Sequence, residues 1–231
     1  MSEIHDGRLL DRRPLTERTV RITLGAASLV GVMVRPAQDI EMLLETDSGV
    51  WVKRRYTIRH ARPEAGEWDV DVVLHAGVGP GNRWARNAET GSRARFAGPC
   101  GKLEPRSAAR HLFVGDLASL PAIAALTEAL PPAQRATAIV QVESAADRLP
   151  LAAETRWLVR PDGSVDAADQ VLGAVRTLPE PDGFGQVYVL GESRTVRSVR
   201  GLLEERGVTR KRIFAKAYWK MQDALPAGDP S

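Results

Sequence analysis

The chain has 231 residues, of which 43% are hydrophobic and 26% are charged, as is typical of a soluble globular protein with one large or two small domains. Its net charge of +3 is too small to indicate nucleic-acid binding, and no apolar run approaches the roughly 20 residues that span a bilayer. The single cysteine, Cys100, excludes an internal disulfide and a four-cysteine iron–sulfur site within one chain. The start of the chain lacks the pattern of a secretory signal, so we expect a cytoplasmic protein, and we favour a monomer.

The first half of the chain is predicted to form short β-strands. From about residue 11 the pattern is β-like, with strand candidates at residues 19–24, 39–44 and 67–75. Residues 91–101 are typical of a final strand with its exit turn. Several short strands at near-regular spacing favour a small antiparallel barrel.

Residues 54–59, Arg-Arg-Tyr-Thr-Ile-Arg, form the most informative of these strands. Arginine, tyrosine and threonine alternate with Ile58, as on a strand with one face exposed to a ligand. Arginine offers a rigid fork for phosphate oxygens, whereas tyrosine can stack on a flat ring and still form a hydrogen bond. The pattern suits a ligand with both a ring and phosphates, although a solvent-facing strand with ordinary charges explains these residues equally well.

A glycine-rich turn at residues 76–81 leads into a short predicted helix over residues 82–88. Backbone N–H groups at such a helix start attract phosphate, and Asn82 is the predicted N-cap. Arg83 is placed where its guanidinium could reach a pyrophosphate. The alternatives are a turn that only connects two elements and, for His75, an ordinary hydrogen-bonded histidine at a strand end.

The polar segment 102–110 marks the predicted boundary between domains 1–106 and 107–231. Beyond it, strands alternate with helices, which implies a parallel sheet with helices on both faces. The predicted strands cover residues 111–114, 136–142, 155–159, 186–190 and 212–220, and the predicted helices residues 118–130, 167–178 and 195–206.

Ligands of such sheets bind beyond the carboxyl ends of the strands, where two motifs stand. Gly115-Asp116 begins the first motif, and Gly191-Glu192-Ser193 forms the second. Glycine lets a nucleotide approach the backbone, and the helix start behind Leu117 could receive phosphate. Strand–glycine–helix junctions also occur generally in α/β domains, so these residues alone leave both interpretations open.

In their order along residues 20–220, these motifs resemble the siderophore-interacting protein family, the FAD-dependent ferric-siderophore reductases of the ferredoxin-reductase superfamily. The four motifs are Arg-x-Tyr-Thr-x-Arg at 54–59, His-x-Gly-x-Gly-Pro-x-x-Arg-Trp-Ala at 75–85, Gly-Asp…Leu-Pro-Ala-Ile at 115–123, and Gly-Glu-Ser at 191–193. The resemblance implies a Greek-key antiparallel barrel that binds FAD, followed by a parallel-sheet α/β domain of the NAD(P)H-binding type. It also implies reduction of Fe(III) in a siderophore to Fe(II), with electrons from NAD(P)H or reduced ferredoxin.

The same resemblance implies the site residues. Arg55, Tyr56 and Thr57 would contact the flavin and its ribityl–phosphate chain, while Arg59, His75 and the helix start at Asn82 and Arg83 would neutralise the diphosphate. Further cofactor contacts are expected from Ile58, Gly79, Pro80, Gly81, Trp84, Gly115, Asp116, Ser119, Gly191 and Glu192. The candidates for binding an anionic ferric siderophore are Arg197, Arg200, Lys216 and Lys220. We expect no catalytic acid or base and no resident metal.

The chain departs from the family pattern at several positions. Cys100 stands where the family usually has arginine, and Leu117 and Ala118 replace an acid and a threonine, although Ser119 offers a hydroxyl one position later. The terminal run at 218–220, Tyr-Trp-Lys, resembles a family Tyr-Trp-Arg and is predicted to fill the seam between the domains. The departures at Cys100, Leu117 and Ala118 keep open one alternative, a flavin reductase or diaphorase with another acceptor. A third possibility is a non-enzymatic flavin- or siderophore-binding module.

Overall fold

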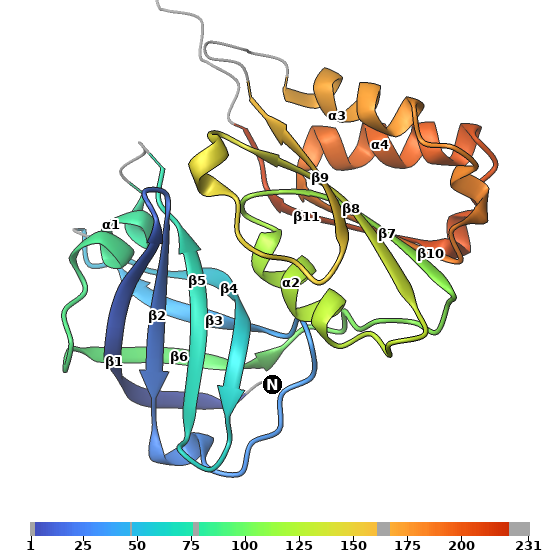
Figure 1. Ribbon diagram of the computed structural model, residues 1–231. Helices are drawn as coiled ribbons and strands as arrows, with labels where there is room; N and C mark the ends of the chain where they lie inside the picture. The colour runs from blue at the N-terminus through green and yellow to red at the C-terminus, as the bar shows by residue number, and fades with distance from the viewer. Residues whose placement is uncertain (1–2, 47, 76–78, 161–166, 222–231) are drawn as a thin grey trace, which may run out of the picture.

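The computed structural model describes residues 3–46, 48–75, 79–160 and 167–221. The chain forms two domains side by side, a β-barrel built from the first half and an α/β domain built from the second (Figure 1). No helix in these ranges has the length and apolar character needed to cross a membrane.

Six antiparallel strands close the barrel in the order β1-β2-β5-β4-β3-β6. Because β3, β4 and β5 are consecutive neighbours and β6 returns to lie beside β3, the topology is a Greek key, as predicted. The short helix α1 lies between β5 and β6. The bounds are β1 (Ile4–Thr16), β2 (Thr19–Gly25), β3 (Asp39–Glu45), β4 (Trp51–Arg62), β5 (Glu67–Val73), α1 (Pro80–Asn87) and β6 (Arg93–Cys100).

The barrel core follows from the alternation of these strands. Val20, Ile22 and Leu24 of β2 point inward beside Trp68 and Val70 of β5, and all five are buried. Removing such side chains from water is the main favourable term in folding.

Strand β1 begins seven residues before the predicted start of the β-like region. Its first inward positions are His5 and Gly7, which hide the apolar alternation until Leu9. Both ring nitrogens of His5 form hydrogen bonds, one with Ser28 Oγ at 2.8 Å and the other with the Gly98 carbonyl at 2.9 Å. A polar residue with partners inside the barrel therefore explains why periodicity alone placed the first strand too late.

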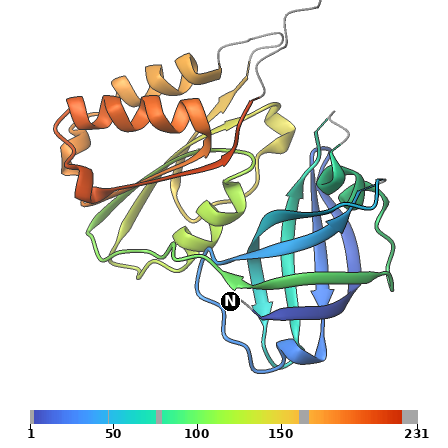
Figure 2. The same cartoon turned by 180° about the vertical axis from the view of Figure 1, so that it is seen from behind.

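The second domain has five parallel strands in the order β11-β10-β7-β8-β9. Helix α2 covers one face, and helices α3 and α4 cover the other (Figures 1 and 2), which confirms the predicted architecture. The bounds are β7 (Arg110–Asp116), α2 (Leu120–Glu128), β8 (Arg135–Val142), β9 (Glu154–Val159), α3 (Ala167–Arg176), β10 (Gln186–Glu192), α4 (Ser193–Glu205) and β11 (Ile213–Trp219). Four short 3-10 turns complete the described structure: η1 (Ala27–Leu29), η2 (Ala145–Asp147), η3 (Pro181–Gly183) and η4 (Arg210–Arg212).

Three ion pairs between described residues join the two domains. The Arg59 guanidinium of β4 donates to both carboxylate oxygens of Glu128 on α2. Lys216 Nζ of β11 lies 3.0 Å from Asp39 Oδ2 of β3. Arg18 pairs with the buried Asp147 at 3.3 Å. The predicted domain boundary, between residues 106 and 107, falls in the segment that connects β6 to β7.

Candidate functional site between the two domains

A groove of about 830 Å³ runs between the barrel and the α/β domain. We call its two sides the barrel wall, formed by β4 and the start of α1, and the α/β wall, formed by the carboxyl ends of β7, β10 and β11. The predicted site residues that line it are Arg55, Tyr56, Thr57, His75, Gly79, Gly81, Asn82, Gly115, Asp116, Glu192 and Lys220. The groove therefore brings together residues from all four sequence motifs.

On the barrel wall, the strand period divides β4 into two faces. Arg54 and Tyr56 share the face that packs against α1. A Cβ added at Gly81 would lie 3.3 Å from Arg54 Cγ and would overlap the Tyr56 hydroxyl. The Tyr56 ring also stacks on Trp84 of α1, with ring centroids 5.9 Å apart. Glycine at position 81 thus lets the strand side chains reach the helix start.

The two adjacent arginines of β4 have different partners. Arg55 lies 2.5 Å from Glu41 Oε1 and 3.4 Å from Asp39 Oδ1, and hydrogen bonds from Lys53 and Arg55 lower the pKa of Glu41. Arg54 donates to the Lys53 carbonyl at 2.8 Å, and no carboxylate pairs with it in the described part of the chain. Both arginines line the groove, but of the two only Arg54 keeps its charge uncompensated among the described residues.

The site prediction passed over Arg54, although a sequence signal for it existed. In the spacing Arg-x-Tyr-Thr, the arginine falls on residue 54 and not on residue 55. Because alternate residues of a strand face opposite sides, this shift of one position changes which guanidinium accompanies Tyr56.

Helix α1 begins earlier than predicted. Its first residue is Pro80 and its N-cap is Gly79, so the prediction of Asn82 as the N-cap is wrong. Proline is favoured at the first helical position because its φ is already helical and it has no N–H to leave unpaired. The Asn82 amide instead donates to the His75 carbonyl at 2.6 Å and accepts from the His75 N–H at 3.3 Å, which ties the helix to the end of β5.

The start of α1 remains open to an anion. No described side chain caps it, and its first turn contains no acidic residue. The helix dipole gives this end positive potential, and the stem of Arg54 lies against it at Gly81. Residues 76–78 of the glycine-rich turn lie outside the described ranges.

On the α/β wall, Asp116 closes the end of β7. Its carboxylate accepts hydrogen bonds from the N–H of Ser119 at 3.1 Å, the N–H of Glu192 at 2.9 Å and the indole N–H of Trp219 at 2.7 Å. Burial of the carboxyl group raises the pKa of Asp116. Gly191 has φ +133°, and a Cβ there would lie 2.5 Å from Asp116 Oδ2. Ser119 and Gly191 therefore support Asp116 from behind and lie outside the groove lining.

Glu192 closes the start of α4. Its carboxylate caps α4 by accepting from the N–H groups of Arg194 at 2.6 Å and Thr195 at 2.9 Å, and from Ser193 Oγ at 3.0 Å. Burial alone would raise the pKa of Glu192, but these hydrogen bonds outweigh it and lower the pKa. A carboxylate of the protein itself therefore occupies the start of α4, whereas no side chain caps α2, the helix behind Leu117.

Tyr218 reaches across the seam between the domains, as predicted, and it also lines the groove. Its buried hydroxyl has no hydrogen-bond partner in the described structure. Desolvation raises the pKa of Tyr218, and the Lys216 ammonium lies 5.0 Å from the ring centroid. A buried unpaired hydroxyl beside a groove is costly, and it points to a ligand that supplies the partner.

Several predicted site residues lie elsewhere for clear reasons. Ile58 packs in the barrel core, Arg59 is paired with Glu128, and the three ligand candidates Arg197, Arg200 and Lys216 are outside the groove lining. Arg200 pairs with Glu204 at 2.9 Å and Lys216 with Asp39, so Lys220 alone of the four predicted substrate cations lines the groove. The described ranges contain no group of three or more His, Cys, Asp or Glu side chains that could hold a metal ion.

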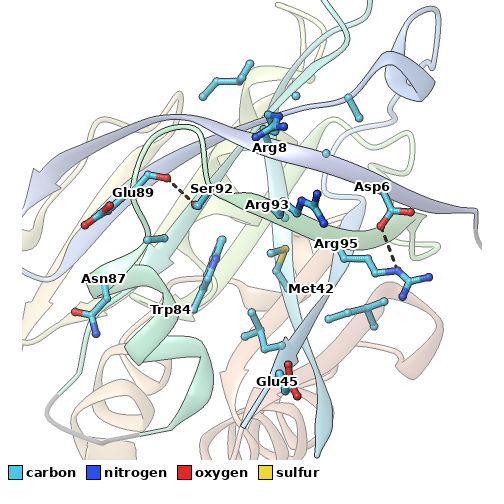
Figure 3. Close-up of a pocket in the computed structure, with 18 of the residues that line it drawn as sticks. Asp6, Arg8, Met42, Glu45, Trp84, Asn87, Glu89, Ser92, Arg93 and Arg95 are labelled. Atoms are coloured by element: carbon cyan, nitrogen blue, oxygen red, sulfur yellow. Dashed lines mark hydrogen bonds and ion pairs between the residues drawn. The ribbon is translucent and has the colours of Figure 1, made fainter. Parts of the chain in front are cut away.

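Pro80, Arg83 and Trp84 line a second hollow of about 1310 Å³, which β1, β3, β6 and α1 surround (Figure 3). In this hollow Arg95 Nε lies 3.3 Å from Asp6 Oδ1, and Arg8 donates to the Gly91 carbonyl at 2.8 Å. All its lining residues belong to the barrel domain. The groove, in contrast, combines residues of both domains with an uncompensated arginine and an unpaired hydroxyl, which makes it the stronger candidate site.

Two family models match successive parts of the chain. Residues 34–103 match the model of the siderophore-interacting FAD-binding domain, and residues 108–222 match the model of the siderophore-interacting protein. The ferric vibriobactin reductase ViuB of Vibrio cholerae is 32% identical over 246 residues, which cover 92% of this chain and 89% of that protein.

Solved structures show the same architecture. A siderophore utilization protein from T. fusca superposes with a TM-score of 0.86 at 28% identity, covering 96% of this chain and 94% of that one. The siderophore-interacting protein SipS from Aeromonas hydrophila gives 0.82 at 26% identity, covering 95% and 99%. A ferredoxin reductase in carbazole 1,9a-dioxygenase shares the fold, with a TM-score of 0.76 at 19% identity over 94% of this chain and 70% of that one.

Proposed function

We propose that this chain, which belongs to the siderophore-interacting protein family, holds FAD in the groove and reduces Fe(III) in a siderophore complex to Fe(II). The observation that carries the proposal is on the barrel wall, where the uncompensated Arg54 lies beside the open start of α1 and the Tyr56 ring. A cation, the positive end of a helix dipole and an aromatic ring together suit a ligand with a diphosphate and a flat ring. The similarity to ViuB, a ferric vibriobactin reductase, supports the reaction class.

The residues present fit this cofactor. Arg54 and the N–H groups at the start of α1 would hold the diphosphate, and Tyr56 and Thr57 would line the ring, facing the Tyr218 hydroxyl. A polar edge of the ring system would give that hydroxyl its missing partner. When bound, FAD would supply the redox chemistry, taking electrons from NAD(P)H or reduced ferredoxin and passing them singly to iron. The side chains bind and orient the ligands, and the reaction requires no acid or base from the chain.

The adjacent residues Arg54 and Arg55 allow a test of whether FAD binds in the groove. We expect the purified protein to be yellow and Arg54→Gln to weaken FAD binding at least about tenfold, because a charge-assisted contact to the diphosphate is lost. Arg55→Gln is the matched control, since it makes the same charge change one residue along, where Asp39 and Glu41 already hold the guanidinium. Titration of the apo-protein with FAD, followed by flavin fluorescence, measures both. Equal losses in the two variants, or full affinity after Arg54→Gln, would contradict the assignment.

A separate comparison tests the acceptor. We expect the loaded protein to reduce a ferric siderophore faster than free flavin or a quinone under the same donor. A preference for free flavin or quinone would favour a general flavin reductase on this scaffold. Bound flavin that no donor bleaches under anaerobic conditions would instead favour a binding module without enzymatic activity.

A further inference from the structure

The ion pair between Arg59 and Glu128, which joins the two domains, includes a third side chain, His60. Arg59 of β4 donates to both carboxylate oxygens of Glu128 on α2, and the same guanidinium lies 2.9 Å from His60 Nε2. Helix α2 packs against β4, and both elements border the groove, β4 through Thr57 and α2 through Pro121. The pair therefore holds together two elements on opposite sides of the groove.

The two neighbours of the His60 ring fix which nitrogen carries its proton. A guanidinium can only donate, so Nε2 accepts from Arg59 and carries no hydrogen in this arrangement. The other nitrogen, Nδ1, lies 3.3 Å from Asp69 Oδ2 and donates to it. His60 in its neutral form, with the proton on Nδ1, therefore satisfies both neighbours.

A proton on Nε2 would reverse the contact between His60 and Arg59. Two N–H groups would then face each other at 2.9 Å, and two cations would repel at that distance. Because arginine keeps its charge, the guanidinium has to move away, and its contact with the Glu128 carboxylate is lost with the movement. The side chain of His60 is 41% exposed, so protons reach it from solvent while the protein stays folded.

A second cation faces His60 from β2. Arg21 Nη1 lies 3.4 Å from His60 Nδ1, and the carboxylate of Asp71 on β5 holds the same guanidinium at 2.6 and 2.8 Å. The charge of Asp71 is therefore used by Arg21, and Arg21 adds to the repulsion that a charged His60 ring would meet.

One carboxylate, that of Asp69 on β5, favours a charged His60 ring. It already accepts from Arg62 of β4 at 2.7 and 3.0 Å and from Thr23 of β2 at 2.8 Å, so its charge is shared. Burial and the two nearby arginines lower the pKa of His60, and the hydrogen bond to Asp69 opposes this only in part. A histidine pKa that is lower in the folded protein favours folding above the unfolded value near 6.5, and this contribution is lost as the pH falls below about 6.5.

We propose that His60 makes the contact between the two domains sensitive to protons: when Nε2 is protonated, Arg59 releases Glu128 and the domain contact beside the groove loosens. Neither of the other two ion pairs described between the domains contains a histidine, so acidification acts on this contact and leaves those two in place. The inference uses only side chains of the protein, so it is independent of the ligand that fills the groove.

The proton-binding step is tested by proton NMR titration of the histidine rings. His60→Gln identifies the His60 signal among those of the four histidines. We expect Arg59→Met to increase the proton affinity of His60 at least about threefold, because the repelling cation is removed. Arg200→Met is the matched control, since it removes the guanidinium of an ion pair on α4, and it should leave this affinity unchanged. An unchanged His60 midpoint in Arg59→Met would contradict the proposal.

The release step is tested by a double-mutant cycle of Arg59→Met and Glu128→Gln, measured as thermal unfolding midpoints. At pH 7.5 we expect a coupling of about 2 °C or more, and less than half of that value one pH unit below the midpoint of His60. In a His60→Gln background the coupling should be the same at both pH values, because the glutamine oxygen accepts from Arg59 and does not titrate.

The same cycle on the pair of Arg200 and Glu204 controls for titration of a glutamate, and its coupling should be equal at the two pH values. Three results would overturn the release step. One is the absence of coupling between Arg59 and Glu128 at pH 7.5, and another is a coupling that does not weaken on acidification. The third is equal weakening in the His60→Gln background, which would assign the effect to Glu128 itself.

Discussion

The two walls of the groove use the same structural element in opposite ways. On the barrel wall, α1 starts at Pro80 with no capping side chain, and Arg54 beside it has no carboxylate partner in the described structure. On the α/β wall, the carboxylate of Glu192 caps the start of α4, while near α2 Asp116 accepts only from the N–H of Ser119, the residue before the helix. A helix start attracts anions only while its N–H groups are free, so the capping residue decides whether it is a binding site or a closed end. The difference teaches that the motif glycines alone do not identify a phosphate site.

The largest effect is expected from a substitution that gives the uncapped start of α1 a carboxylate cap, like the one at the start of α4. Gly79 has φ −59° and ψ 152°, which a side chain adopts without strain, and a Cβ there would meet nothing within 4 Å. We expect Gly79→Asp to cap α1 with a carboxylate and to weaken FAD binding by about 100-fold or more, because the N–H groups are used and the charge is repulsive. Fluorescence titration of the apo-protein measures this loss.

The control for that variant is Gly79→Asn, which caps the helix without a charge. It should cost clearly less affinity than aspartate, and both variants should unfold at or above the wild-type temperature because asparagine and aspartate are good N-caps. Wild-type affinity in Gly79→Asp would show that the start of α1 does not hold the diphosphate.

A second prediction is that an arginine paired with a carboxylate, Arg62, contributes to stability and not to FAD binding, unlike Arg54. Burial alone would raise the pKa of Asp69, but hydrogen bonds from Arg62, Thr23 and His60 lower it to about 2. A depressed carboxyl pKa stabilises the fold above the unfolded value near 4, and this contribution is lost as pH falls from about 4 to about 2. We expect Arg62→Met to lower the free energy of unfolding by about 2 kcal/mol at pH 7 and to leave FAD affinity unchanged.

Urea denaturation of Arg62→Met and the wild-type protein between pH 7 and pH 2.5 checks this prediction. The difference between the two proteins should shrink at the acid end, where Asp69 is increasingly protonated. A constant difference across this range would show that Arg62 stabilises the barrel by packing and not through the charge of Asp69.

The smallest expected effect is on the free energy of unfolding, from loss of the ion pair between Lys216 and Asp39 that joins the two domains. Lys216→Met removes the pair with Asp39, which keeps its partner Arg55, so we expect a loss of about 0.5–1 kcal/mol that decreases with added salt. A double-mutant cycle with Asp39→Asn isolates the pair. Lys53→Met, which removes an exposed pair with Glu41 inside the barrel domain, is the control. A loss above about 2 kcal/mol would show that this single pair carries much of the domain interface.

Much of the fold could be predicted because the apolar residues of each strand and helix recur at the spacing of that element within a short stretch of sequence. Residues 19–24 and 39–44 alternate cleanly and form β2 and β3, and α4 ends before Gly207, whose φ of +89° favours glycine. Strand β1 began too late in the prediction because its first inward positions are a histidine and a glycine.

The site was less predictable because it depends on partners that lie far apart in the chain. Arg59 finds Glu128 at a separation of 69 residues, and Lys216 finds Asp39 at 177. No local pattern shows which cations are used in such pairs, so the site prediction included Arg55 and Arg59, which both have carboxylate partners. The exception is Arg54, which the spacing of the Arg-x-Tyr-Thr motif identifies by itself.

Trp84 stacks on Tyr56 beside the barrel wall, and the Trp219 indole donates a hydrogen bond to Asp116 on the α/β wall. The molecule therefore carries an intrinsic optical reporter on each side of its groove. An occupant that contacts one side should change the emission of the nearby indole, so replacing either tryptophan by phenylalanine would assign a fluorescence response to one half of the protein without any attached label.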